Sequence, residues 1–235
     1  MNDELQSTIS DIVKRDWRAN PAVRALMDDY IEYHRVLALV GVVVTLALLA
    51  TSLNLLRSYW RHRRITEPGA RFRKRVFLGV GTYVGALGLL FALLTAVNAA
   101  TATQPIPGFT SIVETSTPRN DSAVGRSLIT WVRSGSPETP SIIETKVKER
   151  LAWQRPKAIV CGLLFAAFVA LSRKLWRSLL NGAHRGMSSR RTKRTVTLVA
   201  GVGSVLASTL LLVMSIANTQ ASLAPLSISV FLGST

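Results

Sequence analysis

Three stretches of the chain are long, apolar and free of charged side chains, and they constrain the fold more than any other feature. They cover residues 36–56, 76–99 and 195–217, and none contains Asp, Glu, Lys or Arg. A helix needs about 20 largely apolar residues to cross the roughly 30 Å hydrocarbon core of a bilayer. A soluble helix of this length would carry charges on its exposed face. We therefore expect all three stretches to span a membrane.

A fourth apolar run, 158–171, is shorter and ends before Arg173 and Lys174. Its length would also suit a buried or interfacial segment. The apolar pattern continues past the two charges at Leu175 and Trp176, and Lys and Arg near a helix end can extend to the head groups. We therefore predict a fourth span over about 157–176, and an all-α protein with four transmembrane helices.

The first 35 residues are acidic and have no apolar stretch typical of a signal peptide. We therefore expect the first span to be an uncleaved anchor. The single cysteine, Cys161, lies within a predicted span. A single cysteine cannot form an intrachain disulfide. We expect Cys161 to fill space as a small apolar side chain.

The net charge of +16 is concentrated in two segments, 57–75 and 172–194, which contain sixteen Lys and Arg residues and one acid, Glu67. Each segment joins two adjacent spans, and the positive-inside rule places such segments in the cytoplasm. Both chain termini are then expected outside the cell. The membrane that the chain spans is expected to be the plasma membrane. Anionic lipid head groups would bind these residues; a nucleic-acid or other partner site is the less favoured alternative. The residues expected to set topology and contact lipid are Arg57, Arg61, Arg63, Arg64, Arg71, Arg73, Lys74, Arg75, Arg173, Lys174, Arg177, Arg185, Arg190, Arg191, Lys193 and Arg194.

The two halves of the chain match in order when one is displaced by about 120 residues. Polar and Pro landmarks carry the match: Asn98 pairs with Asn218, and Pro105 with Pro225. We therefore predict two tandem helical-hairpin repeats, 1–117 and 118–235. Repeat 1 would contain an outer amphipathic helix, spans at about 36–56 and 76–99, the basic turn 57–75 and an outer loop. Repeat 2 would contain an outer amphipathic helix, spans at about 157–176 and 195–217, the basic turn 172–194 and an outer tail.

Small residues recur at helical spacing in three of the spans. Such stripes let helix backbones approach closely in lipid, where no hydrophobic drive brings helices together. The first span has no such stripe, and its Val42–Val44 face suits lipid or a partner. The residues expected to pack are Gly81, Gly85, Gly88 and Ala92 in the second span, Gly162, Ala166 and Ala170 in the third, and Ala200, Ser204 and Ser208 in the fourth.

The segments before the odd-numbered spans have apolar residues near helical spacing, including Ile9, Val13, Leu26 and Tyr30. They predict amphipathic helices that lie on the outer membrane face or on a partner. Residues 101–126 are rich in Thr, Ser, Pro and Gly, which predicts a loop.

Residues suited to catalysis are sparse. No Asp, Glu, Lys, Arg or His lies inside the three long apolar runs, and no Walker motif, nucleophile elbow or zinc spacing occurs. His62 and His184 occupy matched places in the basic turns, but only Glu67 lies near as an acid. Asp28 and Asp29 could hold a divalent ion, although an exposed acidic helix face is the simpler interpretation.

We therefore expect a non-catalytic integral membrane subunit that packs against a larger membrane assembly. Its expected partners are other membrane subunits and anionic lipids, with homo-oligomers as a further option and no nucleic acid. No cofactor, catalytic residue or metal ligand is expected, apart from bound lipids. A small oligomeric channel or transporter is the second hypothesis, and a lipid-modifying enzyme using Asp28, Asp29 or the histidines is the third.

Overall fold

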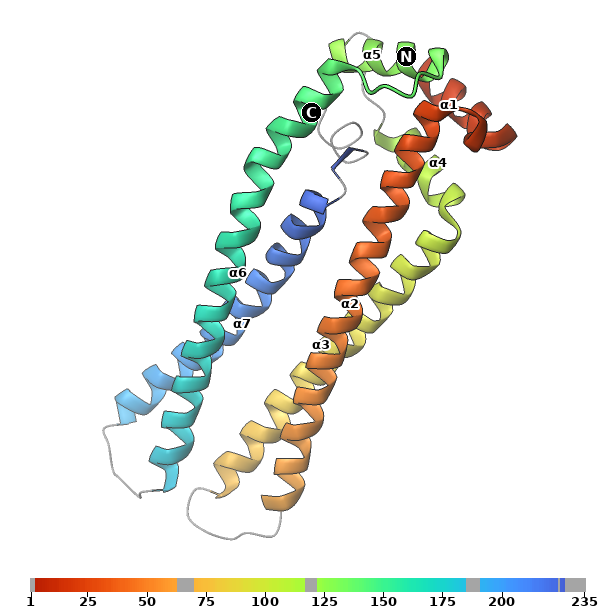
Figure 1. Ribbon diagram of the computed structural model, residues 1–235. Coiled ribbons are helices and arrows are strands. Elements are labelled where there is room, and N and C mark those ends of the chain that lie inside the picture. The colour runs from red at the N-terminus through yellow and green to blue at the C-terminus, as the bar shows by residue number, and fades with distance from the viewer. Residues whose placement is uncertain (1–2, 63–69, 117–121, 185–190, 224, 227–235) are drawn as a thin grey trace. The chain divides into compact units, whose positions relative to one another are not determined.

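The computed structural model describes residues 3–62, 70–116, 122–184, 191–223 and 225–226. Within these residues the chain is helical and contains no strand, so the predicted all-α class is confirmed. The helices shown in Figure 1 are α1 (Asp3–Asp16), the 3-10 turn η1 (Trp17–Ala19), α2 (Pro21–His62), α3 (Ala70–Thr103), α4 (Pro105–Ser116), α5 (Ala123–Ser134), α6 (Ser141–His184) and α7 (Arg191–Leu223).

Four of these helices are long and apolar enough to cross a membrane, namely α2, α3, α6 and α7. The short run 158–171 belongs to α6, a helix of 44 residues whose apolar part extends past the run itself. The membrane character predicted from the sequence is therefore confirmed by helix length and composition.

The helices extend well into the segments that were predicted as basic turns. Helix α2 continues to His62 and α3 begins at Ala70, while α6 continues to His184 and α7 begins at Arg191. Arg and Leu, which are frequent there, are good helix formers, and adding residues to an existing helix is easier than starting one. Residues 63–69 and 185–190 lie outside the described residues.

The chain divides into two compact units, and the four long helices contribute residues to both. Unit 1 consists of Met1–Leu39, Ala96–Lys157 and Ala217–Thr235, and unit 2 consists of Val40–Thr95 and Ala158–Ile216. Unit 2 therefore contains the apolar middle parts of the long helices. Unit 1 contains the start of α2, the end of α3, the start of α6 and the end of α7, together with α1, α4 and α5.

Unit 1 has a core of fully buried apolar side chains. Helix α1 contributes Leu5 and Ile9, and the start of α2 contributes Leu26. Trp131 of α5 and Ile143 of α6 complete the same cluster. The apolar faces of these segments were expected to lie on the membrane or on a partner. The structure corrects this: in the described chain they pack against one another, because helices α1, α4 and α5 supply matching apolar faces.

The segment 101–126, predicted as a loop, is mostly helical, since it contains α4 and the start of α5. Pro105 is the first residue of α4, where a missing N–H does no harm. Phe109 and Val113, one turn apart, are fully buried in the core of unit 1. Thr110 bonds back to the carbonyl of Ile106 at 3.0 Å. Tertiary burial thus outweighs the turn-like composition on which the loop prediction rested.

The Asn20 side chain forms hydrogen bonds with two helices of unit 1, α2 and α5. Its side-chain oxygen accepts a hydrogen bond from the Val23 N–H at 3.0 Å, which caps the start of α2. Its amide nitrogen donates to the Val132 carbonyl near the end of α5 at 2.8 Å. Helix α5 itself is capped by Ser122, and it ends at Gly135, whose φ of 61° lies in the left-handed region.

Candidate functional site

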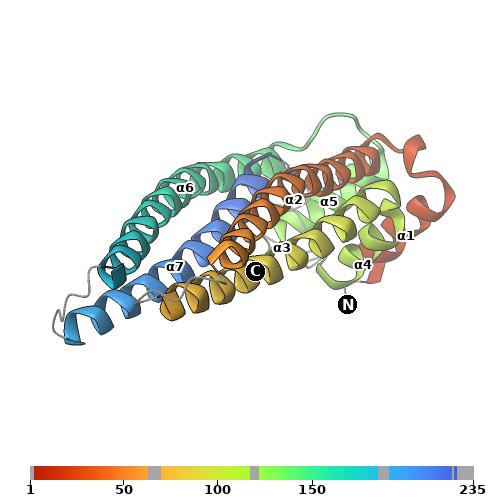
Figure 2. The same ribbon diagram turned by 90° about the horizontal axis from the view of Figure 1, so that it is seen from below.

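Glycines of α3 provide a close helix contact in unit 2, where α2 lies beside α3 (Figure 1, Figure 2). Gly81 and Gly88 are buried. A Cβ at Gly81 would lie 3.2 Å from the Leu56 side chain, and a Cβ at Gly88 would lie 2.8 Å from Leu49. The leucines of α2 therefore occupy the space that the missing side chains leave.

A hydrogen bond reinforces this contact. The Ser52 hydroxyl, which is buried, donates to the Gly81 carbonyl at 2.8 Å. A Cβ at Gly85 would lie 2.8 Å from the same hydroxyl oxygen. Gly85 thus keeps open the space that the Ser52 hydroxyl occupies. Ala92, the last residue of the predicted stripe in this span, is half-buried.

Helix α2 has a matching stripe of small residues that was not predicted from the sequence. Gly41, Thr45 and Ser52 are buried along one face of that helix, although the first span was expected to lack such a face. Their steps of four and seven residues return to the same side of a helix, a spacing that could have been found in the sequence. Val42 and Val43 are exposed on the other side.

Helices α6 and α7 also pack through glycines in unit 2. A Cβ at Gly201 would lie 3.4 Å from the Trp176 ring, and a Cβ at Gly162 would lie 3.6 Å from the Ser215 hydroxyl. These separations are ordinary van der Waals contacts. The α6–α7 contact at these two glycines is therefore looser than the α2–α3 contact.

Three of the predicted packing residues are exposed within the described part of this chain. Ala166 and Ala170 of α6 and Ala200 of α7 are exposed. Residues four apart on a helix are rotated by about 40° beyond a full turn, so a strict four-residue stripe drifts away from the contact face. The inward face of α7 follows a three-four pattern instead, through buried Gly201, Ser204 and Ser208.

The basic residues predicted to contact lipid lie at one end of the long helices of unit 2. Arg73 and Lys74 are half-buried. Arg63, Arg64, Arg185 and Arg190 fall outside the described residues, and only the backbone of Arg191, Lys193 and Arg194 is described. The exposed ones are Arg57, Arg61, Arg71, Arg75, Arg173, Lys174 and Arg177.

Two cavities lie within unit 2 near this basic end. The first, which we call the four-helix cavity, has a volume of about 430 Å³ and is lined by residues of α2, α3, α6 and α7. The second, which we call the side cavity, has a volume of about 470 Å³ and is lined by α3, α6 and α7. They share a wall made of Val76, Val80, Tyr83, Trp176 and Val205. Tyr83 also bonds to Thr209 of α7, with 3.2 Å between the hydroxyl oxygens.

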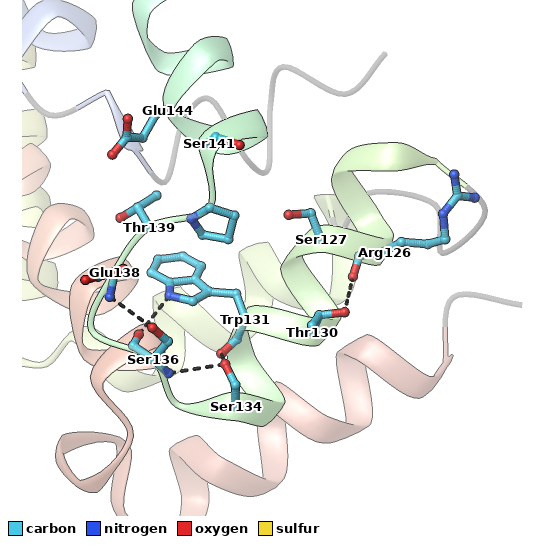
Figure 3. Close-up of a pocket in the computed structure, with 11 residues that line it drawn as sticks. Arg126, Ser127, Thr130, Trp131, Ser134, Ser136, Glu138, Thr139, Ser141 and Glu144 are labelled. Carbon is cyan, nitrogen blue, oxygen red and sulfur yellow. Dashed lines mark hydrogen bonds between the residues drawn. The ribbon is translucent and has the colours of Figure 1, made fainter.

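A third cavity, of about 730 Å³, lies in unit 1 between α5 and the start of α6 (Figure 3). Many of its polar groups form hydrogen bonds that stabilise the turn after α5. The Trp131 indole N–H donates to the Ser136 carbonyl at 2.8 Å, and the Ser136 hydroxyl accepts from the Glu138 N–H at 3.2 Å. The Thr130 hydroxyl bonds to the Arg126 carbonyl at 3.0 Å. The lining therefore mainly stabilises the fold of this segment.

The residues considered for catalysis are separated. His34 of α2 bonds to Asn98 of α3 at 2.7 Å, whereas the His62 ring bonds to the Ser58 carbonyl at 2.8 Å. Asp29 accepts a hydrogen bond from the Leu226 N–H at 3.2 Å, and Asp28 is exposed. The side chain of His184 is not among those described. In the described part of the chain, no three His, Cys, Asp or Glu residues gather as a metal site would require.

Comparison of the chain with profiles of known protein families, with curated protein sequences and with solved structures finds no match.

Proposed function

We propose that this protein is a non-catalytic integral membrane subunit that packs against a larger membrane assembly. The observation that carries the proposal is the exposed small-residue face of α6. Ala166, Ala167 and Ala170 are exposed there, and only 6% of the most apolar window of α6 is buried. Small residues favour close helix–helix contact in lipid, so this face suits a helix from another subunit.

Purification of the full chain from its native membrane in mild detergent tests this proposal. We expect a complex containing another membrane protein, and we expect Ala170→Trp to reduce the yield of that partner. Ala86→Trp is the matched control, because Ala86 is also exposed in unit 2 but lies on α3. A chain that runs alone as a stable monomer, with no co-purifying protein, would refute the proposal.

We further propose that the basic end of unit 2 is cytoplasmic and contacts anionic lipid head groups. The positive-inside rule supports this orientation. It places residues 1–35, 100–157 and the C-terminal tail outside, and these are the stretches that gather in unit 1. The predicted plasma-membrane location is part of the same proposal.

Single-cysteine labelling tests the orientation in a Cys161→Ala background. A membrane-impermeant maleimide should label Ser7→Cys in intact cells, because Ser7 is exposed in unit 1. It should label Arg61→Cys, exposed near the end of α2, only after the cells are permeabilised. The opposite pattern would reverse the proposed topology.

We also propose that the chain consists of two tandem repeats, 1–117 and 118–235. Helix starts support this at a displacement of 120 residues, since α2 begins at Pro21 and α6 at Ser141. The two repeats would then share one orientation, because each contains two spans.

Packing contacts repeat at the same displacement. Gly81 faces Leu56 in the first half, and Gly201 faces Trp176 in the second. Gly201 lies 120 residues after Gly81, and Trp176 lies 120 residues after Leu56. Expression of 1–117 and 118–235 as separate chains tests this proposal: we expect the two to insert independently and to associate. Failure of both halves to insert would contradict it.

A further inference from the structure

The two cavities of unit 2 suit an occupant that is apolar along most of its length. The four-helix cavity is lined mainly by aliphatic and aromatic side chains, among them Leu55, Phe77 and Phe165. The side cavity continues this lining with Phe72 and Leu206. Their volumes of about 430 and 470 Å³ lie within the range of about 300–1,000 Å³ typical of small-molecule sites.

Most of the hydroxyl groups in the lining are already engaged in hydrogen bonds. The Thr51 hydroxyl donates to the Ala47 carbonyl at 2.7 Å, and the Ser208 hydroxyl donates to the Ser204 carbonyl at 2.8 Å. Thr209 bonds to the Val205 carbonyl at 3.1 Å. These hydroxyl groups offer little to a polar solute, and apolar cavities tend to remain dry. The Trp176 indole N–H, in the wall that both cavities share, is buried without a hydrogen-bond partner in the described part of the chain, so it can donate to one acceptor of an occupant. An apolar chain therefore fits the lining better than an ion, a sugar or water.

The lining of each cavity includes one arginine. Arg75 of α3 lines the side cavity and Arg173 of α6 lines the four-helix cavity. Both side chains are exposed, and in the described part of the chain neither forms an ion pair with an acidic residue. An occupant of either cavity would therefore lie beside a positive charge that has no acidic partner in the described part of the chain, which favours an anionic end group.

The side cavity also opens towards the surface that faces lipid. Val202 and Leu206, which line it, are 47% and 56% exposed. A lipid from the surrounding bilayer could enter by this route without crossing a polar barrier.

From the apolar lining, the arginine at each edge and the lipid-facing opening, we infer that unit 2 holds an anionic phospholipid. An acyl chain occupies the adjoining cavities, and the phosphate group is bound by Arg75 and Arg173. The inference deepens the proposed contact between the basic end and anionic head groups, and it rests on that membrane placement. It adds a defined site to what would otherwise be a general attraction between charges.

Native mass spectrometry on the delipidated full-length protein tests the inference. The protein is titrated with phosphatidylglycerol or with phosphatidylcholine carrying the same acyl chains, and bound lipids are counted. We expect the first phosphatidylglycerol to bind about tenfold or more tightly than phosphatidylcholine, because phosphatidylglycerol brings a net negative charge to the two arginines, whereas the choline of phosphatidylcholine offsets the charge of its phosphate. Equal affinity for the two lipids would overturn the inference.

Two pairs of variants separate a site from surface charge. Arg75→Gln with Arg173→Gln should abolish the preference for phosphatidylglycerol. The control, Arg57→Gln with Arg177→Gln, removes the same charge from two exposed arginines that line neither cavity, and it should leave the preference within about twofold of the wild type. Equal losses in the two double variants would mean that only general surface charge attracts the lipid.

A cavity-filling variant tests the apolar half of the site. Val205→Phe adds a ring to the wall that the two cavities share and should weaken the first phosphatidylglycerol about tenfold. Val199→Phe is the control on the same helix, where the side chain is 65% exposed and lines neither cavity. Unchanged binding by folded Val205→Phe would overturn the cavity assignment. These measurements use the purified chain alone, so their failure is distinguishable from failure to find a protein partner.

Discussion

The contact between Gly85 and Ser52 allows a quantitative prediction about how α2 and α3 are held together. In Gly85→Ala the new Cβ would lie 2.8 Å from the Ser52 hydroxyl oxygen, which donates to the Gly81 carbonyl. Overpacking of a tight contact costs about 1–3 kcal/mol. Loss of an interhelical hydrogen bond in a membrane protein adds about 0.6 kcal/mol on average. Against this, alanine is the better helix former by about 0.5–1 kcal/mol.

The net expectation for Gly85→Ala is a destabilisation of about 1–3 kcal/mol. Gly79→Ala is the matched control on the same helix, because a Cβ there meets nothing within 4 Å. It has the same gain in helix propensity without the clash. We therefore expect Gly79→Ala to range from neutral to about 1 kcal/mol stabilising.

A double-mutant cycle makes the test stricter. In Ser52→Ala the hydroxyl is gone, and the remaining Cβ lies 3.6 Å from the position of a Cβ at Gly85, an ordinary contact. Adding Gly85→Ala to Ser52→Ala should therefore cause little further loss of stability, so the two changes should be strongly non-additive. Reversible unfolding in mixed micelles, followed by circular dichroism or steric trapping, measures each free energy. Additive effects, or equal effects of Gly85→Ala and Gly79→Ala, would refute the reasoning.

Three further predictions concern unit 1, and thermal unfolding of the full chain measures each. Asn20→Ala removes both the cap on Val23 and the bond to the Val132 carbonyl, and should cost about 1–2 kcal/mol; Asn20→Asp, which keeps only the capping oxygen, should recover part of this, and no recovery would argue against the cap. Gly135→Ala forces a residue with a side chain into a φ of 61° and should cost about 1–2 kcal/mol, whereas Gly203→Ala, which meets nothing within 4 Å, should not destabilise. Phe109→Ala opens a cavity among fully buried side chains and should cost about 3–5 kcal/mol; a loss below 1 kcal/mol would mean that α4 is not part of a cooperative core.

The spans were predictable because each depends on local composition. About 20 apolar residues in succession have few stable arrangements in water, so the runs 36–56, 76–99 and 195–217 identify membrane helices without any knowledge of their neighbours. The same applies to the small residues of α3, whose spacing in sequence already follows the helical period.

Segments with mixed composition were not predictable in this way. Residues 105–116 contain two prolines and several hydroxyl residues, and they form a helix because Phe109 and Val113 are buried against other elements. Ala166, Ala170 and Ala200 satisfy the spacing rule for packing and yet are exposed. Which side of a helix meets its neighbour depends on how the other helices are placed, and spacing alone does not contain that information.

The sequence by itself determined that this is a helical membrane protein with two strongly basic segments and four apolar runs, because hydrophobicity and charge act residue by residue. Only the tertiary structure decided that α1, α4 and α5 share a buried core with the ends of α2 and α6, and that Gly85 accommodates the Ser52 hydroxyl. It also decided that Arg75 and Arg173, 98 positions apart in the chain, stand at two adjoining cavities. These features depend on contacts between distant residues, and such contacts exist only once the helices have packed.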